Sequence, residues 1–242
     1  MRKPLERILQ TQGFGTRKGC RHLVWNGRVA VGGETLEDPF IELETDGLVF
    51  TVDGVEQRYR DKAYVVLNKP AGVECSQKPK FHPSVYSLFP DYLREREIQT
   101  VGRLDEDTTG LLILTDDGNF IHTLTSPKKK LGKVYAVTVK HPVDAAQIEA
   151  LMQGVVLNDA PEPVQAVACQ VVSDHLVHLT LTEGKYHQVK RMVAAVGNRV
   201  EALHRIRIGQ FDLPADLPLG EWRWLEEADL EQLLRPDPAL ST

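Results

Sequence analysis

The chain of 242 residues is long enough for one large domain or two smaller ones. Hydrophobic residues account for 42% of it and charged residues for 26%, the ordinary balance of a globular protein. No stretch approaches the ~18 apolar residues of a membrane span, and no apolar core of signal-peptide length follows the first residues, so we expect a cytoplasmic protein.

Cysteine and histidine usage indicates neither a disulfide framework nor a metal site. The three cysteines, Cys20, Cys75 and Cys169, are odd in number and far apart, and they form no C-x-x-C pair. The eight histidines include no H-x-x-x-H pair with a nearby acid. We therefore predict no metal and treat each cysteine as a small apolar residue or a free thiol.

The formal net charge of −5 is unevenly distributed. Residues 1–30 carry seven Lys or Arg against one acid, Glu6, whereas residues 31–56 carry eight acids and no Lys or Arg. Two further basic runs consist of Lys128, Lys129, Lys130, Lys133 and Lys140, and of Lys185, Lys190, Arg191, Arg199, Arg205 and Arg207. One such run is also typical of a solvated surface, but three on an acidic protein favour a phosphate-rich partner.

Two helices and several short strands are predicted at the N-terminus. Leu5, Ile8 and Leu9 have helical spacing and indicate a helix that is broken by Gly13 to Gly15. Thr16 is a suitable N-cap for a second helix over 17–25. Short strands are expected at 28–31 and 48–52. With the motifs G-x-G-T-R-K and N-G-R-V-x-V-G-G, this pattern resembles the S4-type RNA-binding domain.

That resemblance sets the predicted domain organisation. We expect an S4-like α/β RNA-binding domain at residues 1–56 and a polar linker at 57–62. A larger domain follows at 63–235, and residues 236–242 form a terminal tail.

The most informative stretch runs from Val101 to Gly118. An apolar run, Leu111 to Leu114, predicts a buried strand, and a loop rich in Gly, Asp and Thr precedes it. For an isolated Asp in such a loop, turn chemistry is the stronger interpretation. Here, however, Arg103 and Asp105 alternate along the loop, and a cation beside a carboxylate suits a nucleophile or a base.

The rest of the chain alternates predicted helices and strands. Helices are expected at 119–125, 143–152, 186–196 and 226–234, and strands at 63–67, 133–139, 164–172, 175–182 and 200–209. The helix at 186–196 has an apolar stripe made of Tyr186, Val189, Met192, Val193 and Val196. Its basic residues, Lys190 and Arg191, lie close to the opposite face.

The segment G-R-L-D-x-x-T-x-G-L-L-x-L-T-x-D-G resembles the catalytic motif of pseudouridine synthases over about seventeen positions. The catalytic aspartate of that family falls on Asp105. Asp107, Asp116 and Asp117 do not occupy that place, and we interpret them as turn and surface carboxylates. The segment L-N-K-P-x-G, which ends at Gly72, resembles a second family motif, credited with holding the active-site loop.

Three further motifs imply substrate-binding residues by the same resemblance. The K-x-Y tyrosine that stacks on the target base corresponds to Tyr135, although an isolated strand tyrosine is more often a sheet-face or core residue. The basic residue that pairs with the catalytic aspartate corresponds to Lys190, with Arg191 as a possible substitute. Leu203 would line the uracil pocket, and Arg103 would help fill the place vacated by a flipped base.

The resemblance is closest to the RsuA family, which modifies 16S ribosomal RNA. It implies an α+β fold, in which a catalytic domain with a mixed, largely antiparallel sheet follows the S4-like domain. The reaction involves no redox change, and with no G-x-G-x-x-G present we predict no cofactor. The expected partner is ribosomal RNA or an assembling small-subunit particle, bound by a monomer. Whether Asp105 attacks the base or the sugar, or removes a proton from C2′, stays open.

Three alternatives are kept. The first is the same reaction on 23S ribosomal RNA, since sister enzymes share these motifs. The second is a non-catalytic ribosome-assembly factor with S4-type RNA binding. The third is a glycoside hydrolase, which would need a second carboxylate acting as acid, and the sequence offers no evident one.

Overall fold

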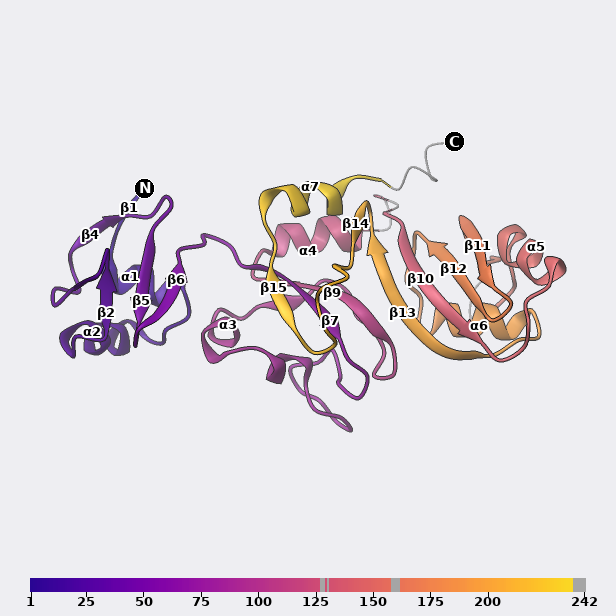
Figure 1. Ribbon diagram of the computed structural model, residues 1–242, viewed down its shortest axis with the longest axis horizontal. Helices are drawn as coiled ribbons and strands as arrows, with labels where there is room; N and C mark the ends of the chain where they lie inside the picture. Colours follow the sequence, from indigo (N-terminus) through magenta and orange to yellow (C-terminus); the bar gives the residue numbers. More distant parts are fainter. Residues whose placement is uncertain (127–128, 130, 158–161, 237–242) are drawn as a thin grey trace. The chain divides into compact units, whose positions relative to one another are not determined.

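A computed structural model describes residues 1–126, 129, 131–157 and 162–236 (Figure 1). Lys128, Lys130 and the predicted tail beyond residue 236 lie outside the described residues. Backbone contacts divide the chain into two compact units. The small unit comprises Met1–Ala63, Phe89–Gln99 and Thr115–Asp117, and the large unit comprises Tyr64–Leu88, Thr100–Leu114 and the described residues from Gly118 onward. The prediction of an S4-like domain stays a prediction.

The two N-terminal helices form where the sequence predicts them. Helix α1 spans Leu5–Thr11 and α2 spans Arg17–Trp25. The side chain of Thr16 accepts a hydrogen bond from the Gly19 amide and so caps α2. The apolar residues of α1 pack against α2 and the adjacent strands in one buried cluster, which consists of Leu5, Ile8, Leu9, Cys20, Val24, Val29, Phe50 and Val52.

The small unit contains two sheets of short strands. One has the order β3 (Glu34–Thr35), β2 (Val29–Val31), β5 (Val49–Val52) and β6 (Val55–Arg58), and the other pairs β1 (Arg2–Pro4) with β4 (Glu42–Glu44). Strand β6 corrects the predicted linker, because Gln57 and Arg58 pair with β5. A tight turn at Asp53-Gly54, where both φ angles are positive, connects β5 to β6. Strand β6 lies at the edge of its sheet, where polar side chains are tolerated, so its polar sequence did not indicate a strand.

Helix α3 (Asp91–Glu95) belongs to the small unit, where the ring of Tyr92 stacks on Phe14 at 5.6 Å. The following Arg96 is buried and donates to Asp116 Oδ2 from Nε and Nη2 at 2.8 and 2.7 Å. The interpretation of Asp116 as a surface carboxylate was therefore wrong. Its partner lies twenty positions earlier in the chain, and no local motif marks the pair.

The large unit is built on one sheet with the strand order β11-β12-β10-β13-β9-β7-β15, in which β14 also pairs with β13 and β8 with β9. The strands are β7 (Tyr64–Lys69), β8 (Gln99–Thr100), β9 (Thr109–Thr115), β10 (Lys133–Val139), β11 (Ala168–Ser173), β12 (Leu176–Leu181), β13 (Val200–Ile208), β14 (Phe211–Asp212) and β15 (Trp222–Trp224). Strand β13 runs parallel to β9 but antiparallel to β10. The predicted α+β class with a mixed, largely antiparallel sheet is confirmed.

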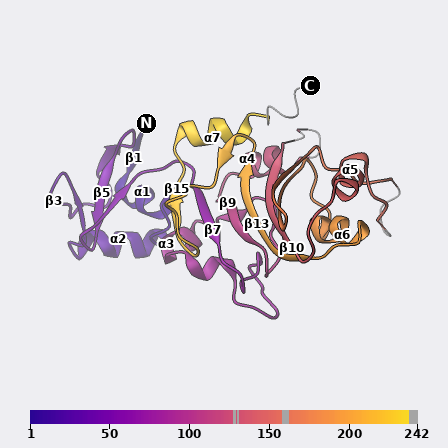
Figure 2. The same ribbon diagram turned by 45° about the vertical axis from the view of Figure 1, so that its right-hand side comes forward.

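Strand β9 lies inside the sheet and is buried on both faces, as its continuous apolar run predicts. Leu111 and Ile113 pack in one cluster with residues of helices α4 (Gly118–Thr125) and α7 (Glu227–Leu234), among them Leu124 and Leu233. Figures 1 and 2 show these two helices side by side. This packing fixes the strand that follows the Asp105 loop.

The other helices of the large unit are α5 (Ala145–Gln153), a 3-10 turn at Val85–Leu88, and α6 (Gln188–Ala195). Helix α6 begins two residues later than predicted, because His187 has a left-handed φ of 48°. Tyr186 is 70% exposed and lies outside the buried stripe, so its assignment to that stripe was wrong. No helix in the described part of the chain is long and apolar enough to cross a membrane.

Candidate active site

The loop between Val101 and Thr108 positions Asp105 at the start of β9. The amide of Val101 donates to the Ile113 carbonyl at 2.8 Å, and Gly102 turns the chain with a φ of 73°. The Thr108 amide then donates to the Asp105 carbonyl at 3.1 Å, which closes a tight turn. The loop is therefore held at both ends by the rigid sheet.

A buried lysine holds this loop from inside the large unit. Lys69 has no solvent exposure, and its Nζ donates to the carbonyl oxygens of Pro70, Asp105 and Thr108 at 3.0, 2.9 and 3.0 Å. Burial lowers the pKa of Lys69. Lys69 belongs to the L-N-K-P-x-G segment, so the structure gives this motif the loop-holding contacts that the resemblance implies.

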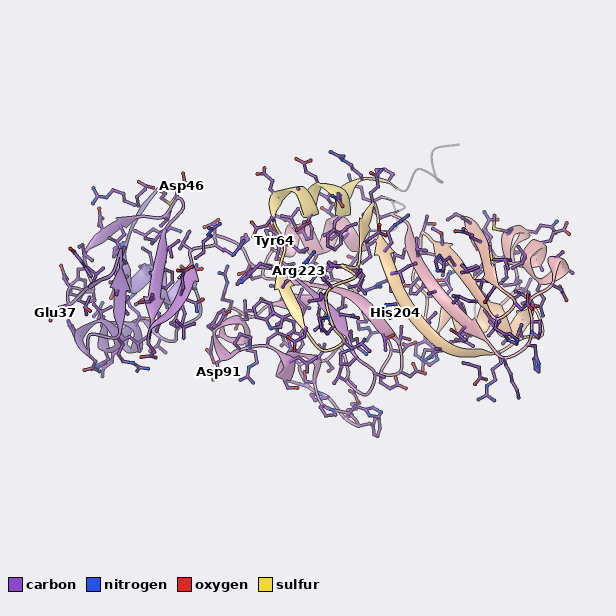
Figure 3. The ribbon with its side chains drawn as sticks, in the orientation of Figure 1. Glu37, Asp46, Tyr64, Asp91, His204 and Arg223 are labelled. Atoms are coloured by element: carbon purple, nitrogen blue, oxygen red, sulfur yellow. The ribbon has the colours of Figure 1, made fainter. Side chains whose placement is uncertain are left out.

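Gly110 allows β9 to approach β13 directly behind the loop. A Cβ at this position would lie 2.3 Å from the backbone oxygen of Arg205, and its φ is 103°. The neighbouring Thr109 contacts His204 Nδ1 with its hydroxyl at 2.8 Å, and His204 is labelled on β13 in Figure 3. These contacts connect the Asp105 loop to β13.

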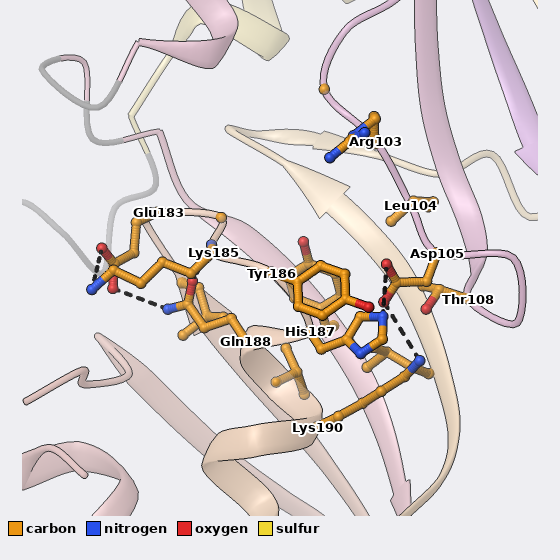
Figure 4. Close-up of a pocket in the computed structure, with 16 residues that line it drawn as sticks. Arg103, Leu104, Asp105, Thr108, Glu183, Lys185, Tyr186, His187, Gln188 and Lys190 are labelled. Carbon is orange, nitrogen blue, oxygen red and sulfur yellow. Dashed lines mark hydrogen bonds and ion pairs between the residues drawn. The ribbon is translucent and has the colours of Figure 1, made fainter. Parts of the chain in front are cut away.

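Two cationic or titratable side chains flank the Asp105 carboxylate (Figure 4). Lys190 Nζ lies 3.4 Å from Oδ2, and His187 Nε2 lies 3.5 Å from Oδ1. The Asp105 side chain keeps 29% of its surface exposed. Of the two basic residues considered as its partner, Lys190 makes this contact, while Arg191 Nη1 donates to the Tyr186 carbonyl at 3.1 Å.

Lys190 lies closer to a second carboxylate than to Asp105. Its Nζ donates to both oxygens of Asp107 at 2.7 and 2.9 Å. Partial burial would raise the pKa of Asp107, but the hydrogen bond from Lys190 and its charge outweigh this effect and lower that pKa. In Lys190, burial would lower the pKa, and the two carboxylates outweigh it and raise that pKa. Asp107 is exposed, as expected of a surface carboxylate, but its ion pair was not foreseen.

A cavity of about 310 Å³ brings all five predicted site residues together. Asp105 and Arg103 come from the loop, Tyr135 from β10, Lys190 from α6 and Leu203 from β13. Tyr135 and Leu203 are each 8% exposed, so the cavity has an aromatic and an aliphatic surface near the carboxylate. Such a site fits a planar ring with a reactive group beside it.

Among the lining residues that were not predicted to belong to the site, His187, Tyr186 and Thr108 are the most informative. His187 contacts Asp105, and its ring stacks on the exposed ring of Tyr186 at 3.8 Å. Both lie within the E-G-x-x-x-Q segment, so their position in that motif was the available signal. Thr108 is 1% exposed, and its hydroxyl has no hydrogen-bond partner in the described part of the chain. Within that part, no cluster of three or more metal-binding side chains is found.

Comparison with known proteins identifies the class of protein to which this site belongs. The family model for RNA pseudouridylate synthases matches residues 63–195, which include the Asp105 loop, Tyr135 and Lys190. The chain therefore belongs to the RNA pseudouridylate synthase family, a family of isomerases, and the family predicted from its motifs is confirmed.

Within this family, the chain is similar to enzymes of the small ribosomal subunit. The ribosomal small subunit pseudouridine synthase A of Escherichia coli K12 is 39% identical over 228 residues, which cover 94% of this chain and 97% of that protein. The protein of the same name from Haemophilus influenzae is 36% identical over 220 residues, with 91% and 94% covered. The crystal structure of a pseudouridylate synthase has 35% sequence identity and a TM-score of 0.68, and covers 95% of this chain and 99% of its own.

Proposed function

We propose that this protein converts one uridine of 16S ribosomal RNA to pseudouridine, as RsuA-type enzymes do. The observation that carries the proposal is the position of Asp105, whose carboxylate enters a cavity formed by Tyr135, Leu203 and Lys190. The similarity to small-subunit pseudouridine synthases over more than 90% of the chain supports the choice of RNA. The expected location is the cytoplasm, where ribosomal particles are assembled.

The reaction breaks the N1–C1′ bond of uridine, turns the base, and joins C5 to C1′, with no net oxidation or reduction. A base inside a helix cannot turn, so the target nucleotide must flip into the cavity. Tyr135 would stack on one face of the uracil, Leu203 would contact the other, and the exposed Arg103 would occupy the place that the base leaves.

Asp105 would act as the nucleophile or base. The charged amine of Lys190 attracts one oxygen of the carboxylate, and the ring of His187 contacts the other. Both contacts exceed the usual length of a charge-assisted hydrogen bond, about 2.7–2.9 Å, so the carboxylate oxygens stay available to a reacting atom. Attack on the base, attack on the sugar, and proton removal from C2′ all remain compatible with one carboxylate.

The small unit would deliver the RNA. Its first 30 residues are strongly basic, and on α2 the ring of Trp25 is 52% exposed next to His22. Exposed aromatic and basic side chains are the usual means of binding unpaired RNA. This role extends the S4-like interpretation of residues 1–56, and we propose a monomer acting on an assembling small-subunit particle.

The test is chemical mapping of pseudouridine in ribosomal RNA from cells that lack this protein. One 16S site should be lost, and wild-type protein should restore it whereas Asp105→Asn should not. Asp174→Asn, an exposed carboxylate in the turn between β11 and β12, is the matched control and should restore the site. Loss of a 23S site would overturn the choice of RNA. Full restoration by Asp105→Asn would overturn the catalytic assignment.

A further inference from the structure

A second cavity of about 150 Å³ adjoins the Asp105 cavity. Four residues line both: Gly102, Arg103, Tyr135 and Gly184. The second cavity is further lined by Lys133 and Arg205, with Leu124 and Ile208 as apolar neighbours. None of the catalytic roles proposed above uses Lys133 or Arg205.

Arg205 is a buried cation with a donor to spare. The residue is only 2% exposed, and its Nε donates to the Leu111 carbonyl at 2.8 Å. Its Nη2 is buried and has no hydrogen-bond partner among the described residues. The guanidinium lies 6.0 Å from the ring centre of Tyr135. A buried, unfilled donor on a charged group costs free energy unless a ligand accepts its hydrogen bond.

Lys133 places a second positive charge in the same cavity. Burial, together with the nearby charge of Arg205, lowers the pKa of Lys133 to about 8. Arg103 also lines the cavity, whereas no Asp or Glu does so among the described residues. Like charges gathered in a partly buried space without a carboxylate repel one another, and an anion would relieve this repulsion.

We propose that this second cavity binds a phosphodiester group of the RNA strand, adjacent to the uridine whose base enters the Asp105 cavity. Arg205 would donate from Nη2, and Lys133 would supply a point charge. Uracil is neutral, so the phosphate is the anionic part of a nucleotide that reaches an adjoining cavity. This inference rests on the proposed function, and it assigns Lys133 and Arg205 to holding the strand.

The experiment uses synthetic RNAs of the mapped 16S segment, each with one methylphosphonate, a neutral linkage, at a different position around the target uridine. Wild-type protein should lose about tenfold in affinity at one linkage, the expected value of a charged hydrogen-bonded contact. Lys133→Gln should bind the unmodified RNA about tenfold more weakly and show a clearly smaller further loss at that linkage, because only the contact of Arg205 with the phosphate is left. Lys133→Arg should restore the wild-type pattern.

The matched control is Lys140→Gln, an exposed lysine just beyond the end of β10 and outside both cavities. It should keep the wild-type sensitivity to the linkage. Thermal unfolding of each variant verifies that Lys133→Gln folds. If Lys133→Gln keeps the full loss at that linkage, or if Lys140→Gln abolishes it, the proposal is overturned.

Three further outcomes distinguish RNA from free phosphate as the source of the anion, and failure of the phosphate site from failure of the catalytic assignment. If Lys133→Gln weakens binding of inorganic phosphate but leaves the linkage pattern intact, the cavity serves free phosphate and the phosphodiester assignment fails. If Asp105→Asn abolishes isomerisation and no linkage depends on Lys133, only the phosphate site fails. If a linkage depends on Lys133 and Asp105→Asn still isomerises, the catalytic assignment fails and the phosphate site stands.

Discussion

Two carboxylate and cation pairs in this chain have different geometries. In the small unit, both oxygens of Asp116 are occupied: Arg96 donates to Oδ2 at 2.7 and 2.8 Å, and the Ala63 amide donates to Oδ1 at 2.8 Å. In the large unit, the Asp105 carboxylate has two long contacts to basic side chains of the described residues, at 3.4 and 3.5 Å, and faces a cavity. A saturated, largely buried pair holds backbone segments together, whereas a loosely paired carboxylate can still react.

The largest effect is expected at Asp105. Replacement by Asn removes the anion but keeps the shape, so isomerisation of the 16S segment should fall by about 10³-fold or more. RNA affinity should change less than about threefold, because most contacts with the RNA do not involve the reacting carboxylate. Single-turnover kinetics and a binding titration measure the two quantities. A large loss of affinity with unchanged turnover would assign Asp105 to binding.

Asp116→Asn is the counterpart in the small unit. Here the free energy of unfolding should drop by about 3 kcal/mol, because the variant leaves the buried guanidinium of Arg96 without its counter-charge. Turnover per folded molecule should stay unchanged. Urea unfolding, followed by kinetics on the folded fraction, checks both. Unchanged stability would show that the pair is not structural.

Lys190 tests whether its charge matters in the loosely paired site. Lys190→Gln should lower turnover by about 10²-fold, the usual effect of removing one electrostatic stabiliser. Lys190→Arg, which keeps the charge, should recover most of this loss. Equal losses in both variants would mean that side-chain shape, and not charge, is what the site requires of this residue.

The comparison of the two pairs shows what sequence could predict. Asp105, Arg103, Tyr135, Lys190 and Leu203 each lie in a dense motif, and all five line one cavity. The pairing of Asp116 depends on a residue brought close by folding. The late start of α6 could not be predicted either. It follows from the left-handed backbone of His187, a conformation that histidine adopts too rarely for the residue type to indicate it.

Lys133 gives a pH-dependent test of the second cavity. A phosphate binds the protonated amine of Lys133 more tightly than the neutral amine. RNA affinity should therefore be constant well below pH 8 and weaken as the pH rises through about 8, the pKa of Lys133 in the protein without RNA. The loss can reach about tenfold per pH unit. Lys133→Arg should abolish the pH dependence, and a decline that persists in this variant would assign it to another group.

The smallest effect is expected at Asp107, which shares Lys190 with Asp105. Its side chain is 58% exposed, so solvent screens the ion pair and its loss should change stability little. In Asp107→Asn, Lys190 is free to move towards Asp105 and tighten the long 3.4 Å contact. We expect a change in turnover of no more than about threefold, together with a lower pKa for Lys190, since one of the carboxylates that raise it is gone. Turnover measured from pH 6 to 11 tests this: the alkaline limb should move to lower pH in Asp107→Asn. A turnover loss as large as that of Lys190→Gln would instead place Asp107 in the catalytic machinery, and the reaction would then require both Asp105 and Asp107.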